Sequence, residues 1–544
     1  MKGTILLAAA ALIAGSAYAQ QRSLDEVISI ANTYYNNIGS DAAQTRADEA
    51  LELIPSSHLL AQDGADEVFY LCNRPRSGFV LVSADVQMPE VLGFSDHAYD
   101  SGKGLPPGLL DVMSGYAFMT SSEGVSRAVT SLQSDISPML QTEWGQNDPY
   151  NRMCPRDGSY RTQTGCVATA VAQVMKFYEW PAKTGKGVID YKTYRKGIPV
   201  KIDLSDYSFA WSYMLNTYEK DKFSNAQANA VSKLMYAAGA ASETDYAASE
   251  SGSTLFDSEL GLWRYFGYDK DMCLLSARNM SDERWEEILL NELNERRPVM
   301  MSANASGKQV GHAFVLDGYQ LKNGNLYYHV NWGWSGAGNG NYLINKLTPT
   351  EDGKDMGVGS FSDSQLIVIN CQPEDGKENT AYAMADAMLV DKDSFESCSD
   401  VSIRLTLNNL VCTLPEGLTA DLIVEVVDEN GNACSQIDIK SVSLLMGVVS
   451  NSVETIQIPT LSDGVYSLHP YLQTAGGLKI EMLSREANLQ FQVGGSQSIT
   501  NLEQEQSVAD IYDVLGRTKK NAGKKTLPAG FYIINGQKIV IREK

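Results

Sequence analysis

The chain has 544 residues, 43% of them hydrophobic, and carries 44 Lys and Arg against 66 Asp and Glu, a formal net charge of −22. This length is enough for roughly three or four domains, and the acidic balance argues against nucleic acid or an anionic membrane as a partner. The eight cysteines are sparse and lack the CxxC spacing of metal sites. We therefore expect no metal and no cofactor.

Residues 1–19 have the features of a secretory signal. Lys2 is followed by a short Ala-rich apolar run and by the small-x-small sequence Ala17-Tyr18-Ala19. This run is too short to span a bilayer, and no later apolar run is long enough. The sequence therefore predicts an exported chain without a membrane span.

Residues 20–127 are predicted to form a first folded unit. Ser23-Leu24-Asp25-Glu26 is a capping box that opens a helix ending near Asn36. The runs 68–71 and 79–83 flank turn residues and predict a hairpin. The polar stretch 121–127 follows, and we expect it to be a linker and an exposed cleavage site.

Residues 128–372 read as an α+β domain, because a helix comes first and strands come later. Apolar residues recur at helical spacing from Val167 to Tyr178, which predicts a helix with Cys166 in its first turn. Thr162 or Thr164 can cap this helix, and Pro181 ends the pattern. Strands are expected at 299–301, 312–319, 326–332 and 366–369, with a turn at 322–325.

Two β-rich segments are predicted after the α+β domain. Residues 380–495 alternate short strand patterns with turn signals such as Asn430-Gly431, which indicates a β-sandwich. Residues 500–544 hold three further strand patterns and form a small β C-terminal domain.

Cys166 is the leading candidate for chemistry. The unpaired N–H groups at a helix start carry partial positive charge, and a thiol placed there is shifted toward the nucleophilic thiolate. The alternative interpretation is a small buried core cysteine, the usual state of an isolated cysteine. The choice depends on whether the same domain supplies a base.

Histidine is the usual base for a cysteine nucleophile, and only His312 and His329 share the predicted domain with Cys166. His312 follows a glycine-bearing loop, 302–311, at the start of an apolar strand, where reactive groups are favoured. His329 lies inside a strand pattern, where a packed structural residue is more common. We therefore prefer His312, whose separation of 312 − 166 = 146 residues fits the roughly 130–150 residues of papain-like enzymes.

A third group should orient the imidazole, and the segment Asn331-Trp332-Gly333-Trp334 supplies candidates. An amide can accept a hydrogen bond from the imidazole without bearing a charge, and an indole can shield the pair from water and interact with imidazolium. The alternative is a tryptophan-rich turn in a core.

An oxyanion hole needs hydrogen-bond donors. The Cys166 N–H and the Gln146 side-chain amide are candidates, although an exposed loop glutamine is the commoner case.

Four motifs in this order closely resemble the streptopain family of papain-like cysteine peptidases. They are Trp144-Gly145-Gln146 with Pro149-Tyr150-Asn151 and Cys154-Pro155, Thr164-Gly165-Cys166-Val167-Ala168-Thr169-Ala170, Gly311-His312-Ala313, and His329-Val330-Asn331-Trp332-Gly333-Trp334. The resemblance covers about 130–372, and residues 20–127 resemble the inhibitory propeptide of that family more loosely. The cysteine motif lacks the Cys-Gly-Ser-Cys-Trp pattern of papain itself.

The resemblance implies a papain-like fold and a secreted cysteine endopeptidase made as a zymogen, with protein substrates and its own propeptide as intramolecular inhibitor. It implies that Cys166 is the nucleophile, His312 the base, Gln146 an oxyanion donor, and Asn331 and Trp332 the segment that backs the histidine.

The tail 511–534 resembles a type IX secretion sorting domain of Gram-negative bacteria, which implies passage through the periplasm to the medium or cell surface. Alternatives are a cysteine amidase or acyl transferase on the same dyad, and a surface adhesin.

Overall fold

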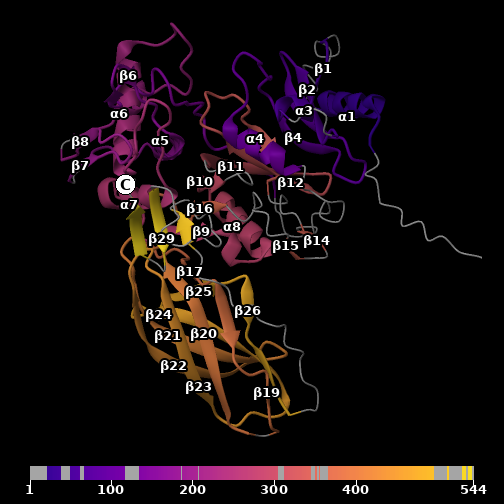
Figure 1. Cartoon of the computed structure of the whole chain (residues 1–544), viewed down its shortest axis with the longest axis vertical. Helices are drawn as coiled ribbons and strands as arrows, with labels where there is room; N and C mark the ends of the chain where they lie inside the picture. The colour runs from indigo at the N-terminus through magenta and orange to yellow at the C-terminus, as the bar shows by residue number, and fades with distance from the viewer. Residues whose placement is uncertain are drawn as a thin grey trace, which may run out of the picture.

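The main sheet of the molecule combines strands from two distant parts of the sequence (Figure 1). In this computed structural model its ten described strands run in the order β1-β2-β3-β4-β13-β12-β11-β10-β16-β9, and all neighbours are antiparallel. The strands are β1 (Glu52–Pro55), β2 (Phe69–Arg74), β3 (Gly78–Ser83), β4 (Val91–Ser95), β13 (Gly340–Tyr342), β12 (Asn325–Asn331), β11 (His312–Lys322), β10 (Val299–Ala303), β16 (Leu366–Ile369) and β9 (Cys273–Ser276).

The structure describes residues 21–37, 49–61, 66–116, 134–184, 187–205, 207–303, 311–344, 350–351, 354–355, 365–397, 399–494, 511–513, 530–534 and 537–541. The predicted signal at 1–19, the linker at 121–127 and most of the loop 302–311 lie outside them. In the described residues no helix is both long and apolar enough to cross a membrane.

Among the described residues, the N-terminal unit contributes β1 to β4 and the helices α1 (Leu24–Asn37), α3 (Ser56–Leu59) and α4 (Pro107–Gly115). The expected capping box is present, because the Ser23 amide donates to Glu26 Oε2 at 2.7 Å and the Glu26 amide donates to Ser23 Oγ at 3.3 Å. Tyr35 anchors α1 to the predicted hairpin by donating its hydroxyl to the carbonyls of Cys72 and Gly78.

The two faces of β11 belong to different cores, because successive side chains of a strand point to opposite sides. Ala313 and Val315 pack in a helical core with α5, whereas Phe314 and Leu316 pack in a core that the N-terminal unit shares. The helical core is built from α5 (Cys166–Tyr178), α6 (Asn225–Ala241) and α7 (Leu255–Phe266). Two small two-stranded sheets belong to the same part of the chain. One pairs β5 (Arg156–Asp157) with β6 (Tyr160–Arg161), and the other pairs β7 (Val188–Lys192) with β8 (Pro199–Asp203). Helix α8 (Asp282–Asn294) packs on the other face.

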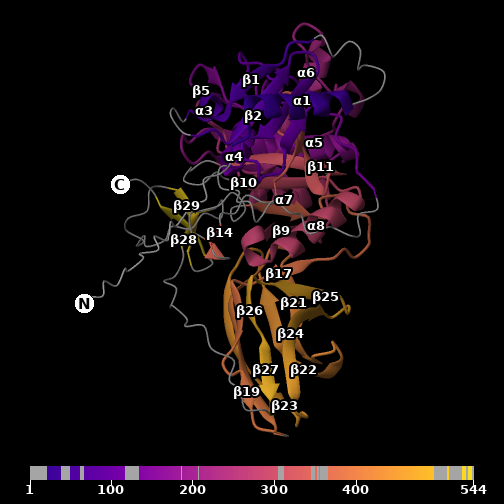
Figure 2. The same ribbon diagram turned by 90° about the vertical axis from the view of Figure 1, so that its right-hand side faces the viewer.

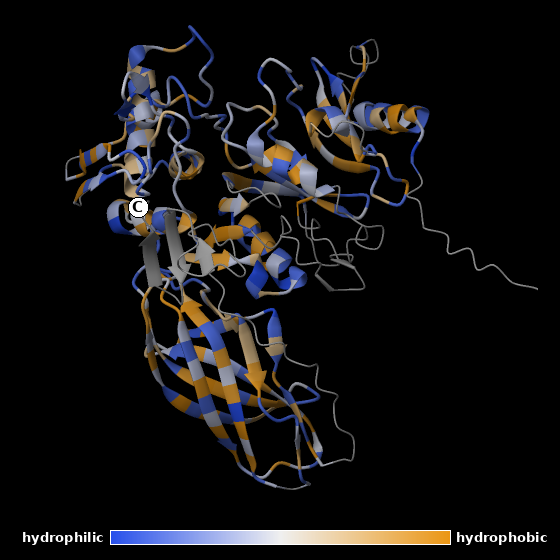
Figure 3. Ribbon diagram, viewed as in Figure 1, coloured by the Kyte–Doolittle hydropathy of each residue, from blue (hydrophilic) through white to orange (hydrophobic). Residues whose placement is uncertain are grey.

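The β-rich C-terminal region extends away from the helices (Figures 1 and 2). Apolar and polar residues alternate along its strands, as the ribbon of Figure 3 shows, so that inward-facing side chains build a core. The strands of the region are β17 (Tyr382–Met384), β18 (Ala387–Val390), β19 (Ser394–Phe395), β20 (Val401–Cys412), β21 (Leu418–Asp428), β22 (Ala433–Leu444), β23 (Ser450–Ile458), β24 (Gly464–Thr474), β25 (Lys479–Leu483), β26 (Glu486–Asn488) and β27 (Gln490–Val493).

This region is joined to the sheet by specific polar contacts. Thr413 Oγ1 bridges the amide and carbonyl of Leu274 on β9 at 3.0 and 2.9 Å. Arg485 donates to the carbonyls of Met280 and Ala277. Two further pieces are β14 (Thr350–Glu351) with β15 (Lys354–Asp355), and a tail sheet of β28 (Ile511–Asp513), β29 (Gly530–Ile534) and β30 (Gln537–Ile541).

The start of α5 differs from the expectation of a threonine cap. The N-cap is Gly165, with φ 88° and no side-chain cap. Thr162 instead donates to the carbonyl of Pro155, and the hydroxyl of Thr164 pairs with that of Thr169. Gly165 is required here because a positive φ favours glycine and a Cβ would lie 3.1 Å from the Ser251 carbonyl oxygen.

Candidate active site

Cys166 is the first residue of α5 and is half-buried. Because no side chain caps the helix, its first amides and the positive end of the helix dipole lie beside the thiol. This local structure favours a negative charge on sulfur and keeps donors near it.

His312 opens β11, is 6% exposed, and forms a side-chain hydrogen bond with Cys166. Its Nε2 lies 3.0 Å from the main-chain oxygen of Trp332. Because that oxygen can only accept, Nε2 carries the proton and Nδ1 is left to face the thiol. The fold thus brings residues 166 and 312 together across the junction of α5 and β11.

The electrostatics of the pair favour a thiolate and an imidazolium. Burial opposes both charges, but the hydrogen bond and charge of His312, together with the amides of Ala313 and Val167, outweigh it and hold the pKa of the Cys166 thiol below its usual value. Burial likewise acts against the imidazolium, yet the hydrogen bond to Cys166, its charge and the Trp332 carbonyl raise the pKa of His312. The largest favourable contribution to both shifts is the mutual stabilisation of opposite charges.

The acceptor at His312 Nε2 is the main-chain carbonyl of Trp332, and the side chain of Asn331, one of the candidates from the sequence, bonds to other groups. Asn331 Nδ2 donates to the Thr142 carbonyl at 2.6 Å, and Asn331 Oδ1 accepts from the Gly333 amide at 3.1 Å. Trp332 is fully buried, and its Nε1 donates to the Gly338 carbonyl at 2.9 Å. Asn331 therefore shapes the turn whose carbonyl holds the imidazole.

Trp334 lies beside the imidazole. Its ring meets the His312 ring edge-on, with centroids 6.1 Å apart and an interplanar angle of 76°. This geometry suits an aromatic edge-to-face contact between the indole and the imidazole.

Gln146 lies in a buried loop near the start of α5, with its residue 8% exposed. Its carbonyl accepts from the Thr164 amide at 3.2 Å, two residues before Cys166. The neighbouring Gly145 fits tightly, because a Cβ there would lie 2.3 Å from Ser335 Oγ. The loop that carries the Gln146 side chain is thus held against the segment that leads to Cys166 and against Ser335, which follows Trp334.

His329 is held in a different arrangement from His312. Its Nδ1 lies 2.5 Å from Asp317 Oδ1, and Asp317 Oδ2 accepts from the Leu140 amide at 2.8 Å. The Asp317 side chain is fully buried. This hydrogen-bonded contact joins β11, β12 and the segment before Trp144, which is a structural role.

Helix α4 of the N-terminal unit covers the histidine. A Cβ on Gly108 would lie 2.8 Å from His312 Cδ2 and 2.9 Å from Trp332 Cζ3. Asp111, also on α4, contributes to the raised pKa of His312. In this form of the chain the N-terminal unit therefore packs directly on His312 and on Trp332, whose carbonyl holds the imidazole.

Sequence reasoning missed two residues at this site. Gln173 and Thr142 are buried, and Thr142 Oγ1 donates to Gln173 Oε1 at 3.0 Å. The available signal for Gln173 was its polar side chain on the apolar face of the predicted helix, seven residues after Cys166.

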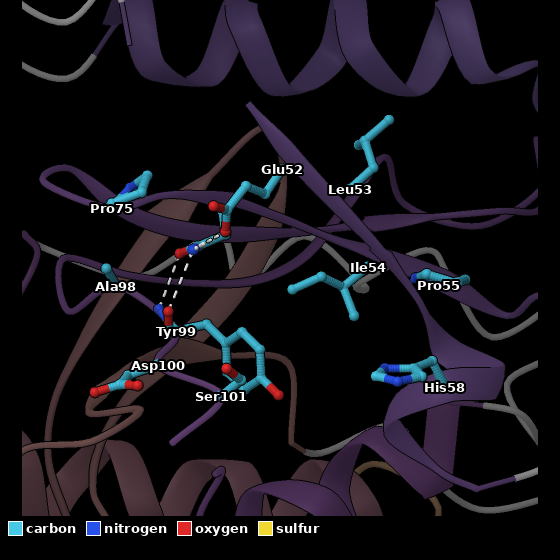
Figure 4. A pocket seen from close by; sticks show the side chains of 11 residues that line it. Glu52, Leu53, Ile54, Pro55, His58, Pro75, Ala98, Tyr99, Asp100 and Ser101 are labelled. Atoms are coloured by element: carbon cyan, nitrogen blue, oxygen red, sulfur yellow. Dashed lines mark hydrogen bonds between the residues drawn. The ribbon is translucent and has the colours of Figure 1, made fainter. Parts of the chain in front are cut away.

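Other polar hollows of the described residues do not extend this site. Asp269, Glu374 and Asp375 form a carboxylate cluster, but the Asp269 oxygens already accept from the Asp271 amide and from Asn379. A pocket of about 680 Å³ lies between β1 and residues 98–101 of the N-terminal unit (Figure 4). There the Asn73 amide is shared by Glu52 and the Tyr99 main chain, so the visible polar groups stabilise the fold.

Comparison with known proteins agrees with this geometry. Residues 144–342 match the model of the peptidase C10 family, and residues 19–117 match that of the Spi protease inhibitor. The chain is 30% identical over 332 residues to streptopain of Streptococcus pyogenes, covering 56% of this chain and 80% of streptopain. It is 29% identical over 421 residues to the thiol protease/hemagglutinin PrtT of Porphyromonas gingivalis, covering 69% of this chain and 48% of PrtT.

A solved structure has the same fold. A fragment of Prevotella intermedia prointerpain A matches with a TM-score of 0.50 and 28% identity, over 60% of this chain and all of that fragment. The papain-like α+β architecture with an inhibitor-type N-terminal unit is thereby confirmed. The chain belongs to the peptidase C10 family, the streptopain family of cysteine endopeptidases, and carries a propeptide of the Spi inhibitor type.

Proposed function

We propose that the chain is the zymogen of an exported endopeptidase that cleaves proteins through a thioester formed on Cys166. In the first step the Cys166 thiolate attacks the carbonyl carbon of the scissile peptide bond. The Cys166 amide and the Gln146 side chain donate to the oxygen as it becomes negative. His312 Nδ1–H then protonates the leaving amine, and the C–N bond breaks.

The second step regenerates the enzyme. Neutral His312 takes a proton from water, the hydroxide attacks the thioester, and the C–S bond breaks to release the acid product and the thiolate. The Trp332 carbonyl keeps the imidazole in the required tautomer through both steps. Trp334 shields the imidazolium that forms in each cycle.

The N-terminal unit is proposed to hold the enzyme inactive until it is removed. Support comes from the position of Gly108 against His312 and Trp332, which leaves no space for a substrate over the imidazole. The Cys166→Ala chain should accumulate uncut, and active wild-type enzyme should cut it between about 121 and 135 if maturation is autocatalytic. Full activity of an intact precursor would contradict an inhibitory role.

Export is proposed on the basis of residues 1–19 and the resemblance of the tail to a type IX sorting domain. Deleting residues from about 500 onward should leave an active peptidase in a foreign host, because Cys166, His312 and Gln146 all lie outside the tail. In the native host the same deletion should trap the chain in the periplasm. Normal export of the truncated chain would rule out the sorting role.

The observation that carries the proposed function is the hydrogen-bonded pair of Cys166 and His312 at the start of α5. The test is incubation of the matured chain, from which the N-terminal unit has been removed, with casein, with and without an epoxysuccinyl inhibitor of cysteine peptidases. We expect casein cleavage that the inhibitor abolishes, with the label found on Cys166 by mass spectrometry. Transfer of the acyl group to an added amine in preference to water would instead indicate an acyl transferase.

A further inference from the structure

Gln173 is a fully buried carboxamide on the nucleophile helix that the catalytic steps do not use. It lies on α5 seven residues after Cys166, so the two side chains share one face of the helix. A buried amide retains its place only when its donor and acceptor groups are paired. The partners of Gln173 therefore indicate what the residue does.

The hydrogen bonds of the Gln173 side chain lead to the segments that supply the other catalytic groups. Its Oε1 accepts from Thr142 Oγ1 at 3.0 Å and from the Trp144 amide at 3.2 Å. Its Nε2 donates to Asn331 Oδ1 at 3.1 Å. One side chain thus connects α5 with the strand that ends at Asn331 and with the loop that leads to Gln146.

Asn331 closes this network. Its Nδ2 returns to the Thr142 carbonyl at 2.6 Å, and its Oδ1 also accepts from the Gly333 amide at 3.1 Å. The residue between Asn331 and Gly333 is Trp332, whose carbonyl holds His312 Nε2. A shift of Asn331 therefore moves the acceptor that orients the imidazole.

We propose that Gln173 is a positioning residue that sets the imidazole and the Gln146 loop relative to the Cys166 thiol. A carboxamide is required because one end must accept two hydrogen bonds while the other end donates one. Glutamate would keep the acceptor but face Asn331 Oδ1 with a second oxygen. Methionine would keep the size of the side chain and remove every one of these hydrogen bonds.

The effect should be visible in catalysis and not only in stability. Small displacements of catalytic groups cost about 100-fold in rate, so kcat of Gln173→Met should fall by about that factor while KM changes little. Because His312 lowers the pKa of Cys166, a displaced imidazole should also move the acid limb of kcat/KM to higher pH. A residue that only stabilised the fold would alter neither quantity.

The control is Asn279→Leu, which removes another buried amide that joins two segments. Asn279 Nδ2 donates to the Ala385 carbonyl at 3.0 Å and to Asp386 Oδ1 at 3.2 Å, beyond β9 at the far edge of the sheet. This variant should lose thermal stability and keep the wild-type kcat and pH profile. Both variants are made as full chains and matured by tagged wild-type enzyme, which is then removed.

The inference rests on the proposed function, and the outcomes separate the two. If the matured wild-type chain does not cleave casein, the proposed function fails. If the wild type is active and Gln173→Met behaves like Asn279→Leu, with lower Tm but unchanged kcat and pH profile, the positioning role is overturned. Should Gln173→Met not fold, Thr142→Val removes a single donor to Oε1 and must reproduce the kcat loss and the pH shift at smaller amplitude, or the role is likewise overturned.

Discussion

At the scale of single residues, the charge state of the site follows mainly from the contact between Cys166 and His312. Cys166 and His312 shift each other's pKa in the directions that favour thiolate and imidazolium, while burial opposes both charges. The sequence alone predicted both residues, because a cysteine at a helix start and a histidine at a strand start leave a recognisable pattern. It did not predict the Trp332 carbonyl, because a main-chain acceptor has no residue type.

Gln146 carries a prediction at this scale. If its amide donates only to the oxyanion, Gln146→Ala should lower kcat by about 100-fold to 1000-fold with little change in KM. Steady-state kinetics on the matured full chain measures both constants. An unchanged kcat would leave Gln146 as a structural loop residue.

At the scale of elements, α5 and the hairpin of β11 and β12 were predictable, and their tertiary contacts were not. Helical spacing and the turn at 322–325 give the local structure, and the structure agrees with both. The pairing of β4 with β13 joins residues about 250 positions apart, and no periodicity in a single sequence reports such a pairing. The same holds for Gln173, whose partners lie on other segments.

Helix α4 gives the prediction for this scale. Gly108→Ala places a Cβ within 2.8 Å of His312, and overpacking of this kind costs about 1–3 kcal/mol. A free-energy change of about 1.4 kcal/mol changes an equilibrium constant tenfold, so a cost of about 1 kcal/mol to the closed precursor raises the population of its open form about fivefold. The thiol of the uncut precursor should therefore be exposed at least about fivefold more often. The measurement is the initial rate at which the epoxysuccinyl inhibitor labels Cys166 in the full chain.

Gly102→Ala is the matched control for Gly108→Ala. Gly102 lies in the same unit, is exposed, and would place a Cβ only against Asp100 Oδ1 at 3.2 Å. Its labelling rate should equal that of the wild type. Equal rates for both variants would show that α4 does not gate the thiol.

At the scale of the whole molecule, the contacts that attach the propeptide include a shared sheet and a charged bridge from His97 to Glu143. The amide of Leu343 donates to the Leu92 carbonyl where β4 meets β13. His97 of the propeptide lies 3.0 Å from Glu143, which directly precedes Trp144. Hydrogen bonds to Asp96 and Glu143 raise the pKa of His97 to about 10.

The raised pKa of His97 predicts a pH dependence of the precursor. A raised value means that the bridge stabilises fully below the unfolded pKa of about 6.5 and is lost as pH rises through about 10. In the Cys166→Ala background, the urea midpoint of the full chain should exceed that of His97→Asn at pH 6. This difference should shrink by pH 10.5. A difference independent of pH would contradict the bridge.

The most direct test of the central claim is the pH dependence of Cys166 alkylation by iodoacetamide in the matured chain, because only the thiolate reacts. We expect the wild-type alkylation rate to rise at a pH well below the usual thiol pKa of about 8.5. His312→Ala should move this rise to the usual range, while His329→Ala should leave it in place. A wild-type rise near 8.5, or the same shift in His329→Ala as in His312→Ala, would contradict a Cys166–His312 ion pair.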